Sequence, residues 1–209
     1  MKVLVTGFTP FNQETVNPSY EAVKALPENI GGAEIVKLEI PTAFSLAGPT
    51  LQTAVETHRP DIVICVGQAG GYAGIAVERV AVNLRDASIP DNEGAQPVDE
   101  PVVSGGPTAY FSTLPTKEIV QALRQNHIPA FLSYTAGTYV CNNLLYTLLD
   151  LTHRTCPDVM GGFIHVPYSL EQAVDKPRGT PSMDILQTKK GLEIAVNVSI
   201  QARLSALKS

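Results

Sequence analysis

Two hydrophobic patterns alternate along the chain. Short apolar runs and stretches of strict alternation are typical of strands, whereas apolar residues three and four positions apart are typical of helices. Strands are predicted over residues 2–8, 34–40, 61–66, 75–84, 130–134 and 161–166. Helices are predicted over residues 17–26, 44–58, 115–126, 139–153 and 182–207, the last either continuous or interrupted at Gly191. Ser19 is a candidate cap for the first helix.

This order of elements indicates the fold class. Strands that alternate with helices form a mostly parallel, twisted sheet with helices on both faces. We therefore expect an α/β protein, a single-domain α/β/α sandwich spanning residues 1–209, because this length suffices for one sizeable core. Residues 75–94 break the rhythm and end in the strong turn signal of residues 90–94, so they should add an antiparallel strand pair or hairpin.

Four segments sit at the ends of predicted strands and carry candidate chemistry. They are Gly7-Phe8, Gly67-Gln68, the turn before Cys141, and His165-Val166. Ligands of open α/β sheets bind outside the carboxyl ends of the strands. We therefore expect these four segments to meet at one edge of the sheet.

Cys141 is the candidate nucleophile. It lies in the first turn of a predicted helix for which Thr138 is the expected N-cap. Unpaired backbone N–H groups and the positive end of the helix dipole both favour the thiolate there. The alternative is a buried, inert cysteine, because Cys141 shares a helix row with Leu144, Leu145 and Leu148.

His165 and Glu78 are the candidate partners of that thiolate. His165 ends an apolar run, and the alternative for it is a hydrogen-bonded core histidine. Glu78 lies among apolar residues of a predicted strand, where a carboxylate is costly unless it is paired. A structural ion pair or an exposed bend is the alternative there. Together the three residue types indicate a cysteine hydrolase.

Composition excludes several other classes. The net charge is −5 and the pI is near 5.3, which argues against a nucleic-acid backbone or an anionic membrane as partner. No apolar run approaches the ~20 residues of a membrane span, and the first residues are too short for a signal peptide. Three widely spaced cysteines suggest no disulfide framework, so a cytoplasmic setting is expected.

The remaining cysteines and histidines suggest no metal site and no cofactor. Cys65 lies in a predicted buried strand, where packing is its expected role, and Cys156 lies in a loop. The other histidines lie at helix ends and have no metal-ligand spacing: His58, His127 and His153. The loop of residues 67–74 lacks the glycine spacings of phosphate-binding loops.

Three long segments together resemble the pyroglutamyl-peptidase I (pyrrolidone-carboxylate peptidase) family of cysteine peptidases. Residues 133–142, SYTAGTYVCN, resemble the cysteine signature of that family, and residues 78–83, ERVAVN, resemble its glutamate signature. Residues 162–168, GFIHVPY, resemble the histidine segment and follow in the right order. The resemblance begins at residues 3–8 and covers most of the chain.

The resemblance implies a catalytic triad and a reaction. Cys141 would be the nucleophile, His165 the general base and then the general acid, and Glu78 the group that orients the imidazole. The reaction would cleave the amide bond after an N-terminal pyroglutamyl group and release pyroglutamate by way of an acyl-enzyme. The Cys141 N–H is a candidate oxyanion donor.

The resemblance also implies a pocket for the five-membered lactam ring. Phe8 and Phe11 would pack on the ring, and Asn17 and Gln68 would lie near its polar edge. The other walls would come from Thr42, Ile89, Tyr139 and Val140. N-terminally pyroglutamylated peptides would be the substrates, and a homotetramer would be the assembly.

The chain departs from the family pattern at several positions. Tyr72 and Ser88 stand where family members commonly carry arginine, and Ala76 replaces a serine or threonine. Asn12-Gln13 replaces a glycine pair. These departures leave two alternatives open, namely a cysteine amidohydrolase for another small acyl amide and a weakly active pyroglutamyl-binding homologue.

Overall fold

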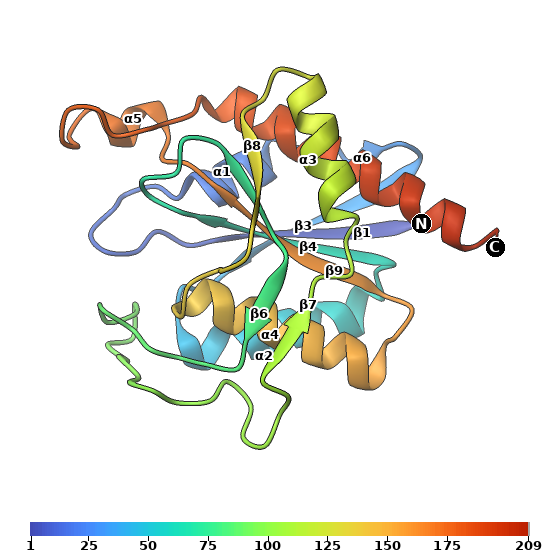
Figure 1. Cartoon of the computed structure of the whole chain (residues 1–209), viewed down its shortest axis with the longest axis horizontal. Helices are drawn as coiled ribbons and strands as arrows, with labels where there is room; N and C mark the ends of the chain where they lie inside the picture. The colour runs from blue at the N-terminus through green and yellow to red at the C-terminus, as the bar shows by residue number, and fades with distance from the viewer. Residues whose placement is uncertain (209) are drawn as a thin grey trace.

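A seven-stranded sheet forms the centre of the computed structural model, which describes residues 1–208 (Figure 1). The strand order across this sheet is β2-β3-β1-β4-β9-β5-β8. Its strands are β1 (Lys2–Phe8), β2 (Asn29–Ile30), β3 (Ala33–Ile40), β4 (Ile62–Gln68), β5 (Ile75–Glu78), β8 (Ala130–Ser133) and β9 (Met160–Val166). Four neighbouring pairs are parallel, and β2–β3 and β5–β9 are antiparallel.

Helices cover both faces of the sheet, which confirms the predicted α/β/α layers (Figure 1). One layer contains α1 (Pro18–Lys24), α3 (Thr116–Gln125) and α6 (Ile185–Ala206); the other contains α2 (Phe44–His58) and α4 (Val140–Thr155). The short helix α5 (Leu170–Ala173) follows β9. No helix of the described residues is long and apolar enough to span a bilayer.

The added antiparallel pair exists, but its strands differ from the expected ones. The predicted strand over residues 75–84 breaks at Arg79, after β5. The continuation, β6 (Val80–Val82), leaves the main sheet and pairs with β7 (Ala109–Phe111) in a separate two-stranded sheet. Sequence analysis did not predict β7, β2 or α5, because each is too short to show a period.

The directions of two strands differ from a simple parallel sheet. Strand β5 runs antiparallel to β9, and β8 runs parallel to β5, so both point away from the edge where β1, β4 and β9 end. The end of β8 therefore does not lie at that edge, contrary to our expectation for the turn before Cys141. The loop of residues 134–139 brings Cys141 there instead.

Several helix ends also differ from the predictions. The side chain of Asn17, rather than that of Ser19, caps α1. The last helix begins at Ile185, three residues later than expected, and Asp184 caps it. It continues without a break through Gly191, where a Cβ atom would lie 2.4 Å from Ile75 Cδ1. The glycine therefore marks a close approach of α6 to the sheet.

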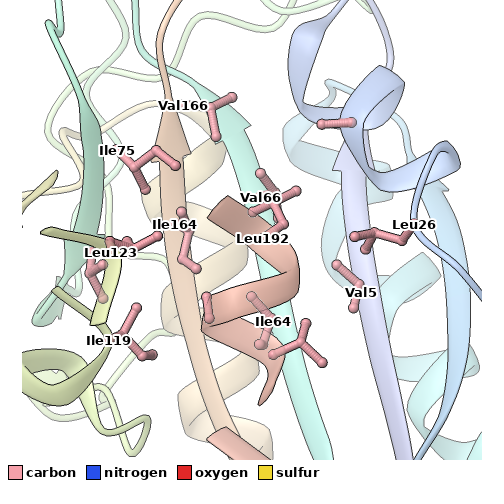
Figure 2. Close-up of a cluster of buried hydrophobic side chains, with 14 of the residues drawn as sticks. Val5, Leu26, Ile64, Val66, Ile75, Ile119, Leu123, Ile164, Val166 and Leu192 are labelled. Atoms are coloured by element: carbon pink, nitrogen blue, oxygen red, sulfur yellow. The ribbon is translucent and has the colours of Figure 1, made fainter. Parts of the chain in front are cut away.

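Two apolar clusters hold the layers together. The first lies between the sheet and α1, α3 and α6, and includes Val5, Ile64 and Ile164 (Figure 2). The second lies under α2 and α4 and includes Leu4, Val63 and Phe163. Because strand side chains alternate between faces, odd-numbered residues of β4 and β9 point into the second cluster. His165 is therefore on the α2 and α4 face.

Candidate active site

Two neighbouring antiparallel strands bring His165 and Glu78 together. Glu78 is directly opposite Phe163 in the ladder, and Phe163 and His165 lie on the same face of β9. Glu78 is therefore the diagonal neighbour of His165, within reach across the strands. Its Oε1 lies 2.8 Å from His165 Nδ1, and both side chains are buried. The pairing fixes the imidazole and leaves Nε2 for chemistry.

Cys141 reaches the same place from the start of α4. It is the second residue of that helix and is partly exposed. A Cβ atom at Gly67 would lie only 2.9 Å from Cys141 Sγ. Gly67 is directly opposite His165 in the β4–β9 ladder, so the sulfur lies over the strand beside the histidine. The absence of a side chain at Gly67 makes room for the thiol.

The charges of the triad favour a protonated imidazole. Burial opposes protonation of His165, but the Cys141 thiolate and its hydrogen bond, together with Glu78, outweigh it. The pKa of His165 is thereby raised from 6.5 to about 9. A thiolate beside an imidazolium is the reactive form of a cysteine nucleophile.

Cys65, on the same face of the sheet, is inert because burial disfavours its thiolate. Cys65 is fully buried in β4, and burial raises the pKa of its thiol to about 12. It packs in the second apolar cluster, as the sequence predicted. Cys141 and Cys65 thus share a residue type but not an environment.

The start of α4 and the loop before it are held to β6 and to the residues that follow β6. The side chain of Asn142, fully buried, accepts from Val82 N at 3.0 Å and donates to the carbonyls of Val82 and Leu84 at 2.9 Å each. Thr138 does not cap α4, because its Oγ1 donates to Asp86 O at 2.7 Å and Tyr139 occupies the N-cap position without a capping side chain. The predicted cap was therefore wrong.

Cys141 N–H remains available at the helix start. The first backbone hydrogen bond of α4 runs from Asn143 N to Tyr139 O, so the preceding N–H groups lack helical partners. Within residues 1–208, Cys141 N–H donates to no protein acceptor. It can serve as an oxyanion donor.

A cavity of about 260 Å³ opens beside Cys141 and His165. Six of the eight predicted pocket residues line it: Phe8, Phe11, Asn17, Thr42, Gln68 and Tyr139. Aromatic contacts hold the walls, since the Tyr139 ring lies 6.0 Å from Phe11 and 5.4 Å from Phe44, centroid to centroid. The aromatic walls suit a small, flat apolar group.

Two predicted pocket residues do not line the cavity. Val140 is fully buried in the second apolar cluster beneath it. Ile89 is half-buried and lies next to Pro90, whose carbonyl accepts a 3.1 Å hydrogen bond from the Tyr139 hydroxyl. Each of these residues adjoins a wall, therefore, rather than forming one.

Polar walls of the cavity are preset by hydrogen bonds. Thr42 Oγ1 donates to Thr9 O at 2.7 Å, and Asn17 Nδ2 donates to the same carbonyl at 3.1 Å. Gln68 Oε1 accepts from Gln172 Nε2 at 2.9 Å. Gln172 in turn is held by the capping box of α5, whose Ser169 N–H donates to Gln172 Oε1. These contacts orient the polar edge before any ligand arrives.

Sequence reasoning missed several residues of the site. Tyr72, which was noted only as a departure, lines the cavity, as do Ala69, Gly70, Ala136 and Gly137. The second departure, Ser88, is exposed and lies outside it. Nearby Arg85 pairs with Glu100 at 3.3 Å and is thus committed elsewhere. Within the described part of the chain, no cluster of metal-ligating side chains exists.

Comparison with known proteins places this arrangement in a family. The family described as "Pyroglutamyl peptidase" matches residues 1–202. The pyrrolidone-carboxylate peptidase of Enterococcus faecalis is 55% identical over 177 residues, which cover 85% of this chain and 83% of that protein. The one from Thermococcus kodakarensis is 54% identical over 198 residues and covers 95% of each chain.

Solved structures agree with the sequence relatives. The crystal structure of pyroglutamyl peptidase I from Bacillus amyloliquefaciens is 50% identical, has a TM-score of 0.91, and covers 95% of this chain and 96% of its own. A mutant pyrrolidone carboxyl peptidase from Pyrococcus furiosus is 43% identical, with a TM-score of 0.94 and coverage of 97% and 99%. The similarity therefore extends over nearly the whole fold.

Proposed function

This chain belongs to the pyroglutamyl peptidase family, and from that premise we propose that it is a cysteine peptidase that removes N-terminal pyroglutamate from peptides. The observation that carries the proposal is the triad at the mouth of a small, partly aromatic cavity. Glu78 holds His165 at 2.8 Å, and Cys141 Sγ lies beside the histidine. A nucleophile, a base and an orienting group are thus in contact.

The first half of the reaction forms the acyl-enzyme. The Cys141 thiolate attacks the carbonyl carbon that joins pyroglutamate to the next residue, and the N–H of Cys141 stabilises the resulting oxyanion. The imidazolium of His165 gives its proton to the leaving nitrogen. The C–N bond breaks, and the shortened peptide departs with a free amino group, leaving a pyroglutamyl thioester.

The second half restores the enzyme. His165, now neutral, takes a proton from water as the water attacks the thioester carbon. The C–S bond breaks, pyroglutamate leaves as the free acid, and Cys141 returns as thiolate beside the imidazolium. Glu78 stabilises each imidazolium form and does not transfer a proton itself.

The cavity supports a neutral lactam as the acyl group. Phe8, Phe11 and Tyr139 provide apolar walls for a flat ring. Gln68, Asn17 and Thr42 provide polar groups for the lactam N–H and C=O. A glutamate or glutamine side chain is longer and, for glutamate, charged, and no lysine or arginine side chain lines the cavity of the described residues.

Release of the fluorophore from pyroglutamyl-aminomethylcoumarin tests the proposal. Under reducing conditions we expect turnover by the wild type and loss of at least about 10⁴-fold in kcat with Cys141→Ala, because the nucleophile is removed. Circular dichroism establishes that the variant is folded. Folded wild type that releases no fluorophore contradicts the proposal and favours another acyl amide or a binding role.

We also propose a cytoplasmic homo-oligomer, in keeping with a single catalytic domain over residues 1–209. Three free cysteines among the described residues support a reducing setting. Several large apolar side chains are exposed and would suit contacts between subunits: Val98, Phe111, Leu186 and Leu207. Size-exclusion chromatography with light scattering measures the state directly, and a monomer at all concentrations would contradict the oligomer.

A further inference from the structure

One row of residues crosses four strands beneath the site. In the strand ladders Gly67 is opposite His165, His165 is opposite Ala76, and Ala76 is opposite Phe131. Residues directly opposite one another point to the same face of a sheet. The small residues on either side of His165 therefore leave two open positions, and Cys141 Sγ occupies the one over Gly67.

Tyr72 occupies the other side of the histidine. Its ring centroid lies 6.3 Å from the His165 ring and 5.3 Å from the Phe131 ring, edge-on in both cases. The ring thus bridges the two side chains that flank Ala76. Tyr72 is half-buried and lines the cavity together with Cys141 and His165.

The strand order separates the two ends of a bound substrate. The residues expected to hold the ring belong to β1, β4 and the loop after β3, on one side of His165: Phe8, Gln68 and Thr42. Tyr72 and Phe131 lie on the other side, toward β5 and β8. The leaving nitrogen must face His165, which protonates it. The chain beyond that nitrogen then runs toward Tyr72.

We propose that Tyr72, supported by Phe131, forms an apolar subsite for the residue that follows pyroglutamate, and that this enzyme prefers large apolar or aromatic residues there. The inference rests on the proposed function. Aromatic rings bind apolar and aromatic side chains through buried area and edge-to-face contact. Ala76 matters because a larger side chain in that position would occupy space between the two rings that Tyr72 bridges.

Steady-state kinetics with pyroglutamyl-phenylalanine amide and pyroglutamyl-alanine amide test this subsite. The wild type should give the higher kcat/KM with phenylalanine. Tyr72→Ala should lower the phenylalanine-to-alanine ratio of kcat/KM about tenfold, because only the phenylalanine substrate loses a ring contact. Tyr72→Phe should keep the wild-type ratio, because the ring rather than the hydroxyl makes the contact.

Tyr134→Ala is the matched control. Tyr134 follows β8, is 66% exposed and lies outside the cavity, so its loss should leave the ratio unchanged. An unchanged ratio in Tyr72→Ala overturns the subsite. Equal loss on both substrates with a shift of the alkaline pH limit also overturns it, because Tyr72 would then act through His165. If folded wild type cleaves neither substrate, the proposed function itself fails.

Discussion

Single side chains decide the chemistry through their surroundings. Cys65 and Cys141 are both thiols on the same face of the molecule, yet burial raises the pKa of Cys65 to about 12, whereas Cys141 is partly exposed at a helix start beside an imidazole. Histidine in water has a pKa near 6.5, and the charged neighbours of His165 raise the pKa of its imidazole to about 9. Residue type alone is therefore a weak guide to role.

Glu78→Gln is the sharpest test of the electrostatic argument. Removing the carboxylate charge removes the coulombic contribution of Glu78 that raises the pKa of His165 above 6.5, and weakens the hydrogen bond that also raises it. The imidazolium then deprotonates at lower pH, so the alkaline limit of kcat/KM, expected near pH 9 in the wild type, should move toward neutral pH. We also expect kcat to fall about 10²- to 10⁴-fold.

A pH profile of kcat/KM measures both effects. Glu56→Gln, on the exposed side of α2, is the control and should leave the limit in place. An unchanged alkaline limit in Glu78→Gln would show that Glu78 does not set the charge state of the histidine.

At the scale of elements, the position of Cys141 depends on the contacts that join the start of α4 to β6 and the residues after it. The helix α4 begins at Val140, but its position depends on the buried side chain of Asn142, which holds the backbone of Val82 and Leu84. Hydrogen bonds between an amide side chain and a distant backbone leave no periodic trace in sequence. These hydrogen bonds of Asn142 nevertheless hold the start of α4, and with it Cys141, against β4 and β9.

Asn142→Ala should therefore destabilise the fold. The substitution leaves Val82 N–H and two carbonyls without their partners, and each unsatisfied buried group costs about 1–3 kcal/mol. We expect the free energy of unfolding in urea to fall by about 2–4 kcal/mol, with an activity loss because the start of α4 is released. Asn126→Ala, at an exposed helix end, should change it by less than about 0.5 kcal/mol. Equal effects of the two substitutions would show that the Asn142 side chain does not stabilise the contact between α4 and the backbone of Val82 and Leu84.

At the scale of the whole molecule, small residues determine how closely the helices pack on the sheet. Gly7 lies under α1, where a Cβ atom would lie 2.5 Å from Tyr20 Cα and 2.6 Å from Tyr20 N. Both contacts are with backbone, which cannot rotate aside. Gly7 therefore determines how low α1 sits on β1, and with it the height of Asn17 at the cavity.

Gly7→Ala should lower the free energy of unfolding by about 2–3 kcal/mol, as expected for overpacking against fixed backbone. Gly48→Ala is the contrasting variant, because its Cβ would lie 3.2 Å from a Thr147 methyl and alanine favours the helix. Its effect should stay below about 1 kcal/mol. Urea midpoints at constant m measure both, and Gly7→Ala as stable as wild type would refute the close approach.

The positions of the long strands and helices, and with them the layers of the whole molecule, were predictable from sequence. The patterns of residues 2–8, 44–58 and 161–166 predicted β1, α2 and β9 within a residue or two, because burial of one face imposes a period on the chain. The layers followed from the order of these elements. Short elements such as β7 and α5 were missed, since three or four residues carry no period.

The sequence by itself determined the long strands and helices, the layered fold and the resemblance to the family, because local periodicity and long motifs are properties of contiguous residues. Only the tertiary structure decided the reversed direction of β5 and β8, the buried clamp of Asn142 and the absence of Ile89 and Val140 from the cavity wall. It also placed Tyr72 between His165 and Phe131. Those features depend on contacts between residues far apart in the chain, whose distances no local pattern records.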